Sequence, residues 1–190
     1  MNRALHLTLE QYDRMIARGA FVGLEKRIEL IFGELREMNP AGPVHDDLIR
    51  YLIRWSRLRT SPSEVDIMSQ SGVALGDFQS RPDPDLLWVR PKRYLREHPG
   101  PEDILLLVEV SDSSLEYDLS EKGSLYARAG VDEYWVVDIS STCVQVFRQP
   151  SPAGYEVAER FCVGDELIPL ALPTACLSLE KLFGDLKMLG

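Results

Sequence analysis

The chain is poor in cysteine, has no long apolar run and has no excess of basic residues, and each shortage removes a class of protein. Its 190 residues include three cysteines, Cys143, Cys162 and Cys176. They lie far apart and form no CxxC pair, so neither a zinc site nor a disulfide framework is indicated. A reducing cytoplasm is therefore the expected location.

Apolar residues are spread along the chain and are not gathered into one segment. No stretch approaches the roughly 20 apolar residues that cross a bilayer. The first residues, Met1–Gln11, also lack the apolar core of a signal peptide. The sequence therefore predicts a protein without a membrane partner.

Charge sets a limit on nucleic-acid binding. The formal net charge is −9 and the pI is near 4.9, which disfavours strong nonspecific binding to phosphates. A local basic surface remains open. Arg50, Arg54 and Arg57 share one side of an expected helix, where a solvated face is favoured over a phosphate contact. The basic segment over residues 90–96 leaves the same choice open, between a surface turn and a phosphate contact.

The fold is organised around residues 104–111, with the sequence Ile-Leu-Leu-Leu-Val-Glu-Val-Ser. Both parities of its first five residues are apolar, which is typical of a strand that is covered on both faces. Such a strand lies centrally in the sheet of an α/β protein. Glu109 near its carboxyl end either faces water or is buried beside a cation or metal.

Further segments complete a mixed α/β prediction, in which a central mixed sheet is flanked by helices. Helices are expected from Thr8, after Pro43, from Leu115 to Ala129, and from Ser178. Strands are expected as a hairpin over residues 27–38, at 64–68, 72–75 and 86–89, and as a meander over 134–161. No repeat or linker is evident, so residues 1–190 are expected to form one domain, with a core at about 20–150, an N-terminal helix and a C-terminal strand and helix extension.

Three residues of these elements carry the chemistry. Asp85 stands at the start of one expected strand, Glu109 lies near the end of another, and Lys122 projects from the apolar stripe of the following helix. Two carboxylates suit a hard divalent cation such as Mg²⁺, and a nearby lysine can steady or activate an attacking water. This combination is able to cleave a phosphodiester.

Two neighbouring acids leave alternatives open. Asp83 competes with Asp85 as the first acid, because it also follows a proline. Glu29 in the expected hairpin has a parity that fits either the core or water.

The chain also resembles a known family. The words Pro84-Asp85, Glu109-Val110-Ser111 and Lys122 are similar to the PD-(D/E)XK nuclease superfamily, and within it to the Uma group of restriction-endonuclease-like proteins. The resemblance covers about residues 20–150. Its specific part is the last run, Glu121-Lys122 with Leu125 to Val131 and Glu133 to Asp138, and the stretches Ile28 to Leu35 and Pro40 to His45 support it.

The resemblance implies a restriction-endonuclease-like fold with metal on Asp85 and Glu109, and Glu29 as an additional acid. Ser111 occupies the slot in which the superfamily usually has lysine. In the similar group the following helix supplies the lysine, which matches Lys122.

Together these observations predict an endonuclease that hydrolyses DNA with Mg²⁺, or with Mn²⁺ in its place. A nuclease-fold binding or regulatory protein without turnover is the main alternative, and a hydrolase of another phosphate ester is a third. A homodimer is expected, because cleavage of both strands needs two active centres and most soluble oligomers have two-fold symmetry. Its surface is expected to include Val144, Val146 and Phe147.

Overall fold

The strand predicted over residues 104–111 is the centre of the sheet. In the computed structural model, which describes residues 5–24, 26–38, 41–184 and 186, this strand is β5 (Ile104–Ser111). It pairs antiparallel with β4 (Leu86–Val89) and parallel with β6 (Glu133–Asp138). Seven of its eight residues are buried, as the double-sided apolar pattern predicts.

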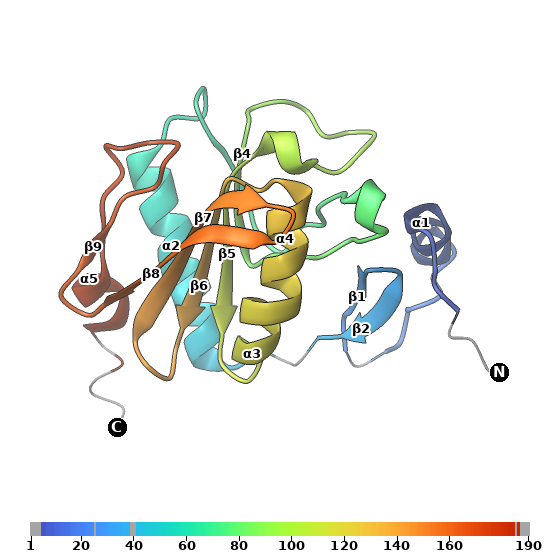
Figure 1. Cartoon of the computed structure of the whole chain (residues 1–190), viewed down its shortest axis with the longest axis horizontal. Helices are drawn as coiled ribbons and strands as arrows, with labels where there is room; N and C mark the ends of the chain where they lie inside the picture. Colours follow the sequence, from blue (N-terminus) through green and yellow to red (C-terminus); the bar gives the residue numbers. More distant parts are fainter. Residues whose placement is uncertain (1–4, 25, 39–40, 185, 187–190) are drawn as a thin grey trace.

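The sheet has six strands in the order β3-β4-β5-β6-β7-β8 (Figure 1). Its only parallel pair is β5 and β6, which are connected by a helical crossover. The remaining strands are β3 (Asp66–Met68), β7 (Cys143–Ser151) and β8 (Gly154–Cys162). The prediction of a mixed sheet flanked by helices is thus confirmed. The expectation of one domain over residues 1–190 stays a prediction.

One face of the sheet is covered by α2 (Pro43–Arg59) and by α5 (Leu179–Phe183) (Figure 1). Pro43 starts α2 because its fixed φ suits the first helical position. Trp55 of α2 stacks on Trp88 with ring centroids 5.2 Å apart, and Trp135 lies 6.2 Å from Trp55. This face is an apolar core.

The other face is covered by the crossover, which begins with α3 (Leu115–Tyr117) and ends with α4 (Gly123–Ala129). Between them lies a π-helical turn, η3 (Asp118–Lys122). The single helix predicted over these residues is therefore one helical segment with a π turn at its middle. Gly130 ends it with φ of 86°, a left-handed conformation that glycine adopts without strain.

A small unit stands beside this face. The predicted hairpin is confirmed as β1 (Ile28–Ile31) paired with β2 (Glu34–Glu37), a separate two-stranded sheet (Figure 1). The N-terminal helix is α1 (Leu9–Ala17), and the Thr8 side chain caps it by accepting a hydrogen bond from the Gln11 backbone. Tyr12 of α1 donates a 2.6 Å hydrogen bond to the Ile28 carbonyl, which ties α1 to the hairpin.

The strand expected at residues 72–75 is wrong. Val73 donates its backbone N–H to Pro82, and Leu75 forms only an isolated bridge with Ser80. Pro82 and Pro84 on the facing segment have no N–H to donate, so a regular ladder does not form there. The remaining short elements are η1 (Gly76–Phe78), η2 (Pro101–Asp103), β9 (Glu166–Leu167) and β10 (Leu177–Ser178).

The cysteine expectation is also corrected. Cys143 and Cys162 face each other across β7 and β8 and form a disulfide. The two residues are 19 apart in sequence, yet antiparallel pairing makes them direct neighbours. The argument that led from isolated cysteines to a reducing compartment therefore loses its basis.

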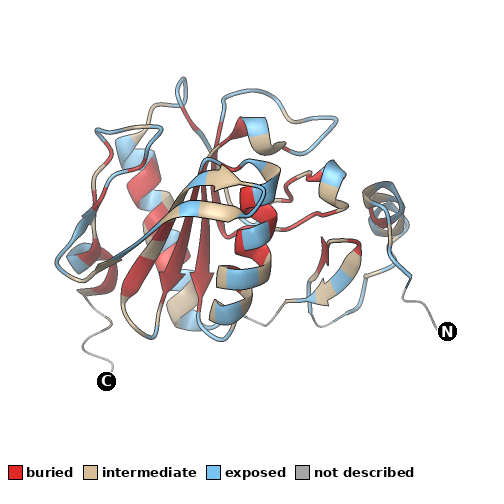
Figure 2. Cartoon of the chain, viewed as in Figure 1, coloured by how far each residue is buried: buried red, intermediate tan, exposed pale blue. Residues whose placement is uncertain are grey.

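The dimer surface expected from β7 is wrong as well. Val144 and Val146 are fully buried in the apolar core of their own chain, and Phe147 packs against the opposite face. In Figure 2 the central strands are buried while the outer hairpin of the sheet carries many exposed residues. These valines are not available to a second copy.

Candidate active site

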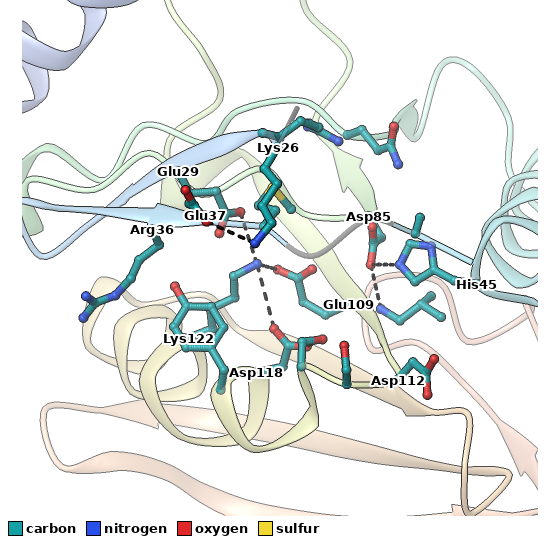
Figure 3. Close-up of a pocket in the computed structure, with 18 of the residues that line it drawn as sticks. Lys26, Glu29, Arg36, Glu37, His45, Asp85, Glu109, Asp112, Asp118 and Lys122 are labelled. Carbon is teal, nitrogen blue, oxygen red and sulfur yellow. Dashed lines mark hydrogen bonds and ion pairs between the residues drawn. The ribbon is translucent and has the colours of Figure 1, made fainter. Parts of the chain in front are cut away.

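A cavity of about 610 Å³ lies at the carboxyl end of β5. Its walls come from the β1–β2 hairpin, the first turn of α2, and the α3–η3 segment, as Figure 3 shows. All four predicted site residues line it: Glu29, Asp85, Glu109 and Lys122. The fold thus brings together side chains that lie far apart in the sequence.

Glu109 forms the floor of the cavity. It is 3% exposed, so the alternative in which it faces water is wrong. Its Oε1 accepts hydrogen bonds from Lys122 Nζ at 2.9 Å and from Tyr126 Oη at 2.8 Å. The carboxylate is therefore buried with a cation and a hydroxyl as partners, as a buried charge requires.

Lys122 reaches this floor from the π-helical turn. Its Nζ lies 3.2 Å from Glu29 Oε1 and 3.9 Å from Asp118 Oδ1, in addition to its contact with Glu109. The side chain is 2% exposed, so the alternative of a lysine that reaches solvent is wrong. One ammonium group joins three elements: the hairpin, β5 and the helical crossover.

Asp85 lies at the edge of the cavity nearest α2. Pro84 precedes it, and β4 begins only at Leu86, so the Asp85 side chain takes the place of a ladder bond and accepts the Val110 N–H at 2.8 Å. His45 Nε2 lies 3.3 Å from the same oxygen, Oδ2. Asp83, the competing first acid, pairs instead with Arg27 at 2.9 Å and is not part of the cavity lining.

Glu29 comes from the hairpin and is 1% exposed. Its Oε1 accepts the Asp83 backbone N–H at 2.8 Å. The open choice between core and water is thereby settled in favour of the interior, because the hairpin folds this face onto the end of the sheet.

Asp118 is a further acid of the site that the sequence reasoning missed. Its Oδ2 accepts hydrogen bonds from Ser111 Oγ at 2.7 Å and from Ser114 Oγ at 2.6 Å. Ser111 stands where the superfamily usually has lysine, but it has a different role. Its hydroxyl holds Asp118, and Asp118 in turn contacts Lys122, the lysine supplied by the following helix. Spacing offered a signal, since Asp118 precedes Lys122 by one helical turn.

Burial and charge perturb the proton affinities of these groups. Burial raises the pKa of Glu109 well above its ordinary value, against the opposing effect of Lys122. Burial also raises the pKa of Asp118, although Lys122 and the two serines oppose it. Burial acts to lower the pKa of Lys122, but Glu109, Glu29 and Asp118 outweigh it and raise that pKa well above its ordinary value.

The excess of buried acids over buried bases also suits the binding of a metal ion. Four acids, Glu29, Asp85, Glu109 and Asp118, are at most 5% exposed. Three of them contact Lys122, and Asp85 contacts His45 instead. Negative charge is therefore in excess, and a divalent cation is a suitable compensation. Within the residues that the structure describes, no group of three or more His, Cys, Asp or Glu is arranged as a ready-made metal site. Two carboxylates completed by waters and a substrate phosphate are the ligand set that Mg²⁺ prefers, so Asp85 and Glu109 fit it.

Comparison with known proteins assigns the family. The sequence matches Uma2, described as "Putative restriction endonuclease", over residues 9–180. The chain belongs to the Uma2 family. Its fold resembles the crystal structure of "a putative nuclease belonging to DUF820" from Anabaena variabilis ATCC 29413, with a TM-score of 0.75 and 16% sequence identity. That similarity covers 94% of this chain and 98% of the other. No curated protein matches the sequence.

Membership in the Uma2 family indicates a nuclease, and the structural similarity shows a shared fold, a restriction-endonuclease-like sheet with helices. Two further residues of this Uma2 protein contact the acids of the site: His45, which lines the cavity and contacts Asp85, and Tyr126, which lies outside the lining and contacts Glu109. In the sequence both residues lie in stretches that resemble the family, but neither was predicted to have a role in the site. The contact of His45 with Asp85 raises the His45 pKa, although burial opposes it.

The two basic stretches noted in the sequence lie outside the cavity lining. Arg50, Arg54 and Arg57 are exposed along α2, in agreement with a solvated face. The segment over residues 90–96 follows the carboxyl end of β4. Because β4 is antiparallel to β5, this segment lies at the end of the sheet opposite Glu109, away from the cavity.

No helix among the described residues has the length and apolar character needed to cross a membrane.

Proposed function

We propose that this protein is a metal-dependent endonuclease that hydrolyses phosphodiester bonds of DNA. The observation that carries the proposal is one buried lysine, Lys122, held among buried carboxylates at the floor of an accessible cavity. Burial of an excess of acids destabilises a fold, and such an arrangement is typical of a functional site.

Each residue has a distinct role in this proposal. Asp85 and Glu109 hold Mg²⁺, for which Mn²⁺ can substitute, and Glu29 completes the acidic environment. When bound, the metal stabilises charge on the phosphate and lowers the pKa of a bound water. Lys122 donates hydrogen bonds that orient the attacking water or a phosphate oxygen, and Asp118, fixed by Ser111 and Ser114, holds the ammonium in place.

Cleavage of plasmid and of single-stranded DNA with Mg²⁺ or Mn²⁺ tests the activity. The parent protein is expected to nick or cut, while Asp85→Asn and Glu109→Gln are expected to be inactive. Glu133→Gln is a matched control, since Glu133 is also fully buried and paired with a basic residue, Arg148, but lies outside the cavity lining. Equal activity of Glu109→Gln and Glu133→Gln would contradict the assignment.

Calorimetry with Mn²⁺ tests the metal separately from turnover. The parent protein and Glu133→Gln are expected to bind the ion, and Glu109→Gln is expected to lose at least tenfold in affinity, because one of its two carboxylate ligands is gone. Equal affinity of all three proteins would remove the site from this cavity.

A second candidate is a nuclease-fold binding or regulatory protein without turnover. The net charge of −9 favours it, and so does the fact that Lys122 and Tyr126 already contact Glu109 Oε1. Absence of Mn²⁺ binding together with absence of cleavage would select this candidate. A phosphodiester that is not a nucleotide, offered as a substrate in the same assay, separates DNA hydrolysis from a more general phosphoesterase activity.

We also propose a two-fold homodimer, because most soluble oligomers have two-fold symmetry. Light scattering at micromolar concentration is expected to give twice the mass of 21.5 kDa, and the monomer mass would contradict it.

The proposed location is the cytoplasm, where a DNA substrate is met. The disulfide between Cys143 and Cys162 is the feature that opposes this location, since cytosolic proteins rarely keep one. Thiol labelling immediately after lysis is expected to find both cysteines reduced, and a protected pair would place the protein elsewhere.

A further inference from the structure

The groups proposed to act on the phosphate lie deep in the cavity. Lys122 is 2% exposed, Glu109 3% and Asp85 5%, and the β1–β2 hairpin stands across the cavity from the helical crossover (Figure 3). A cavity of about 610 Å³ falls within the range of roughly 300–1,000 Å³ that holds a molecule of drug size. One or two nucleotides match that size, whereas both strands of a duplex do not.

The hairpin places cations at the mouth of this acidic cavity. Lys26 and Arg27 precede β1, and Arg36 lies on β2; all three line the cavity. Their side chains are 37–44% exposed and each is paired with an acid, namely Glu37, Asp83, and both Glu34 and Glu121. Exposed pairs of this kind are weak, so a phosphate can replace the acid as the partner.

An aromatic side chain adds a second kind of contact. Tyr117 lines the cavity, and Lys122 Nζ lies 5.8 Å from its ring centroid. Among the described residues its Oη is buried without a hydrogen-bond partner, which is costly unless a ligand supplies one. A ring beside a row of cations is the combination by which proteins hold single strands, with bases on the ring and phosphates on the cations.

From these contacts we propose that the cavity receives a single strand of nucleic acid, such as a chain end or a displaced strand, and that intact duplex is a poor substrate. The inference rests on the proposed function and specifies its substrate. Lys26, Arg27 and Arg36 hold the phosphates that flank the scissile bond, and Tyr117 contacts a base or sugar. Enzymes with recessed active sites act in this way, on single strands or on nucleotides taken out of the stack.

The charge balance defines the conditions of binding. Acids outnumber bases in the cavity lining, so a divalent cation is required before a phosphate can approach the floor. Three cations that contact phosphates give a slope of log affinity against log salt of about −2 for a single strand, at roughly −0.7 for each contact.

Binding, measured separately from cleavage, tests the inference. Fluorescence anisotropy compares one labelled oligonucleotide as a single strand and as a blunt duplex, with Ca²⁺ as the divalent ion and a gel to confirm that the DNA stays intact. We expect the single strand to bind at least tenfold more tightly, with the salt slope given above. Equal or tighter binding of the duplex, or no binding of either, would overturn the inference.

A set of variants at one ion pair separates phosphate binding from closure of the cavity. Arg36 joins β2 to η3 through a 2.8 Å contact with Glu121, so both Arg36→Gln and Glu121→Gln break this link. If Arg36 binds phosphate, Arg36→Gln weakens single-strand binding by about tenfold and lowers the slope by roughly 0.7, whereas Glu121→Gln leaves binding equal or tighter. If both variants weaken binding equally, Arg36 acts only as a strap.

Two more variants complete the test. Arg57→Gln, an equal change of charge on the exposed side of α2, is the matched control and is expected to bind like the parent protein. Tyr117→Leu is expected to lose roughly tenfold in affinity through the missing ring. An effect of Arg57→Gln as large as that of Arg36→Gln would mean that net charge alone governs binding, and would overturn the assignment of the hairpin.

The outcome for the substrate can be told apart from the outcome for the function. A protein that binds the single strand but cleaves nothing with Mg²⁺ or Mn²⁺ retains this inference and loses the proposed function. A protein that cleaves duplex and single strand equally well retains the function and loses this inference.

Discussion

The two faces of the same sheet are built from opposite chemistry. The face under α2 is closed by three tryptophans, of which Trp88 and Trp135 are fully buried. The face under the crossover also has an apolar part, but toward the end of β5 it buries Glu109, Asp118 and Lys122 together with Glu29 of the hairpin. Buried charges stabilise a fold less than apolar side chains of the same volume. The comparison therefore indicates that the first face supplies stability, and the second is the face to which we assign the proposed function.

The largest effect is expected from Trp88→Ala on the apolar face. The substitution removes a stacked ring and the hydrogen bond from Trp88 Nε1 to Ser56, at a cost of about 3–5 kcal/mol of unfolding free energy. Urea unfolding measures this loss. Cleavage per folded molecule is expected to stay close to that of the parent, and Trp88→Phe provides a milder variant if the alanine protein does not fold. A selective loss of activity in the phenylalanine variant would break the division between the faces.

Next in size is Lys122→Met on the charged face. Loss of one electrostatic group in an active site typically costs 10²-fold or more in rate, and single-turnover cleavage measures it. Removal of the cation also leaves Glu109 and Glu29 without their shared partner, so the fold must be checked by circular dichroism. Lys122→Gln also removes the charge but keeps a polar side chain, and it serves as the second variant if the methionine protein does not fold. Full metal-dependent cleavage by either protein would contradict the role of the lysine.

A smaller effect is expected from Glu109→Gln in the absence of metal, and it is a gain in stability where the previous variants lose stability or activity. Because folding raises the pKa of Glu109, its contribution to stability is full below the ordinary value of about 4.3 and is lost as the pH rises through the folded-state pKa. A glutamine stays neutral throughout. With EDTA at pH 8 the variant is therefore expected to melt higher than the parent, by roughly 2–4 °C for each 1 kcal/mol.

Melting curves from pH 5 to pH 8 check that sign. The difference between the two proteins is expected to shrink toward pH 5, and saturating Mn²⁺ is expected to raise the melting temperature of the parent only. A parent protein that is the more stable of the two at every pH without metal would show that the acids of this face are not in excess.

The smallest effect is expected from Ser111→Ala. Asp118 keeps the hydrogen bond from Ser114, so the loss of the Ser111 hydroxyl is expected to cost about 1–2 kcal/mol and less than tenfold in cleavage. Ser114→Ala serves as the paired control from the helical side. A loss of activity as large as that of Lys122→Met would mean that Ser111 itself contacts the substrate.

The sequence predicts the apolar face of the sheet more completely than the charged face. Apolar patterns locate β5, β4 and α2, because the hydrophobic effect acts on every residue of a strand or stripe. Glu109 and Lys122 were found because a charge inside an apolar pattern is conspicuous. His45 was missed because it sits beside two acids at a helix start, where polar residues are ordinary, and Asp118 was missed because an acid inside a helix is ordinary. The contact of His45 with Asp85 joins two separate elements, which one sequence does not encode locally, whereas the one-turn spacing of Asp118 and Lys122 was a local signal.

The disulfide illustrates a signal that was present but not used. The sequence predicts a meander over residues 134–161, and equal steps outward from Pro152 and Ala153, where β7 and β8 turn, lead to Cys143 and Cys162, the observed partners. The spacing of the cysteines alone excluded nothing. The register of the hairpin was not worked out from the sequence. In an antiparallel hairpin, residues at equal distances from the turn face each other, so residues far apart in sequence can be in direct contact.

The π-helical turn at Asp118–Lys122 has a consequence for how this chain can change over evolutionary time. A π turn is equivalent to an α-helix that has gained one residue, and each residue of an α-helix advances by about 100°. Deletion of one residue between Asp118 and Lys122 would restore regular winding and rotate Ser114 and Tyr117 by that angle relative to Leu125 and Tyr126. A single inserted residue thus sets the angle between two halves of the crossover: one half packs on the sheet and the other forms the cavity wall. Lineages that lost or gained that residue would keep the core and present a different wall to the substrate.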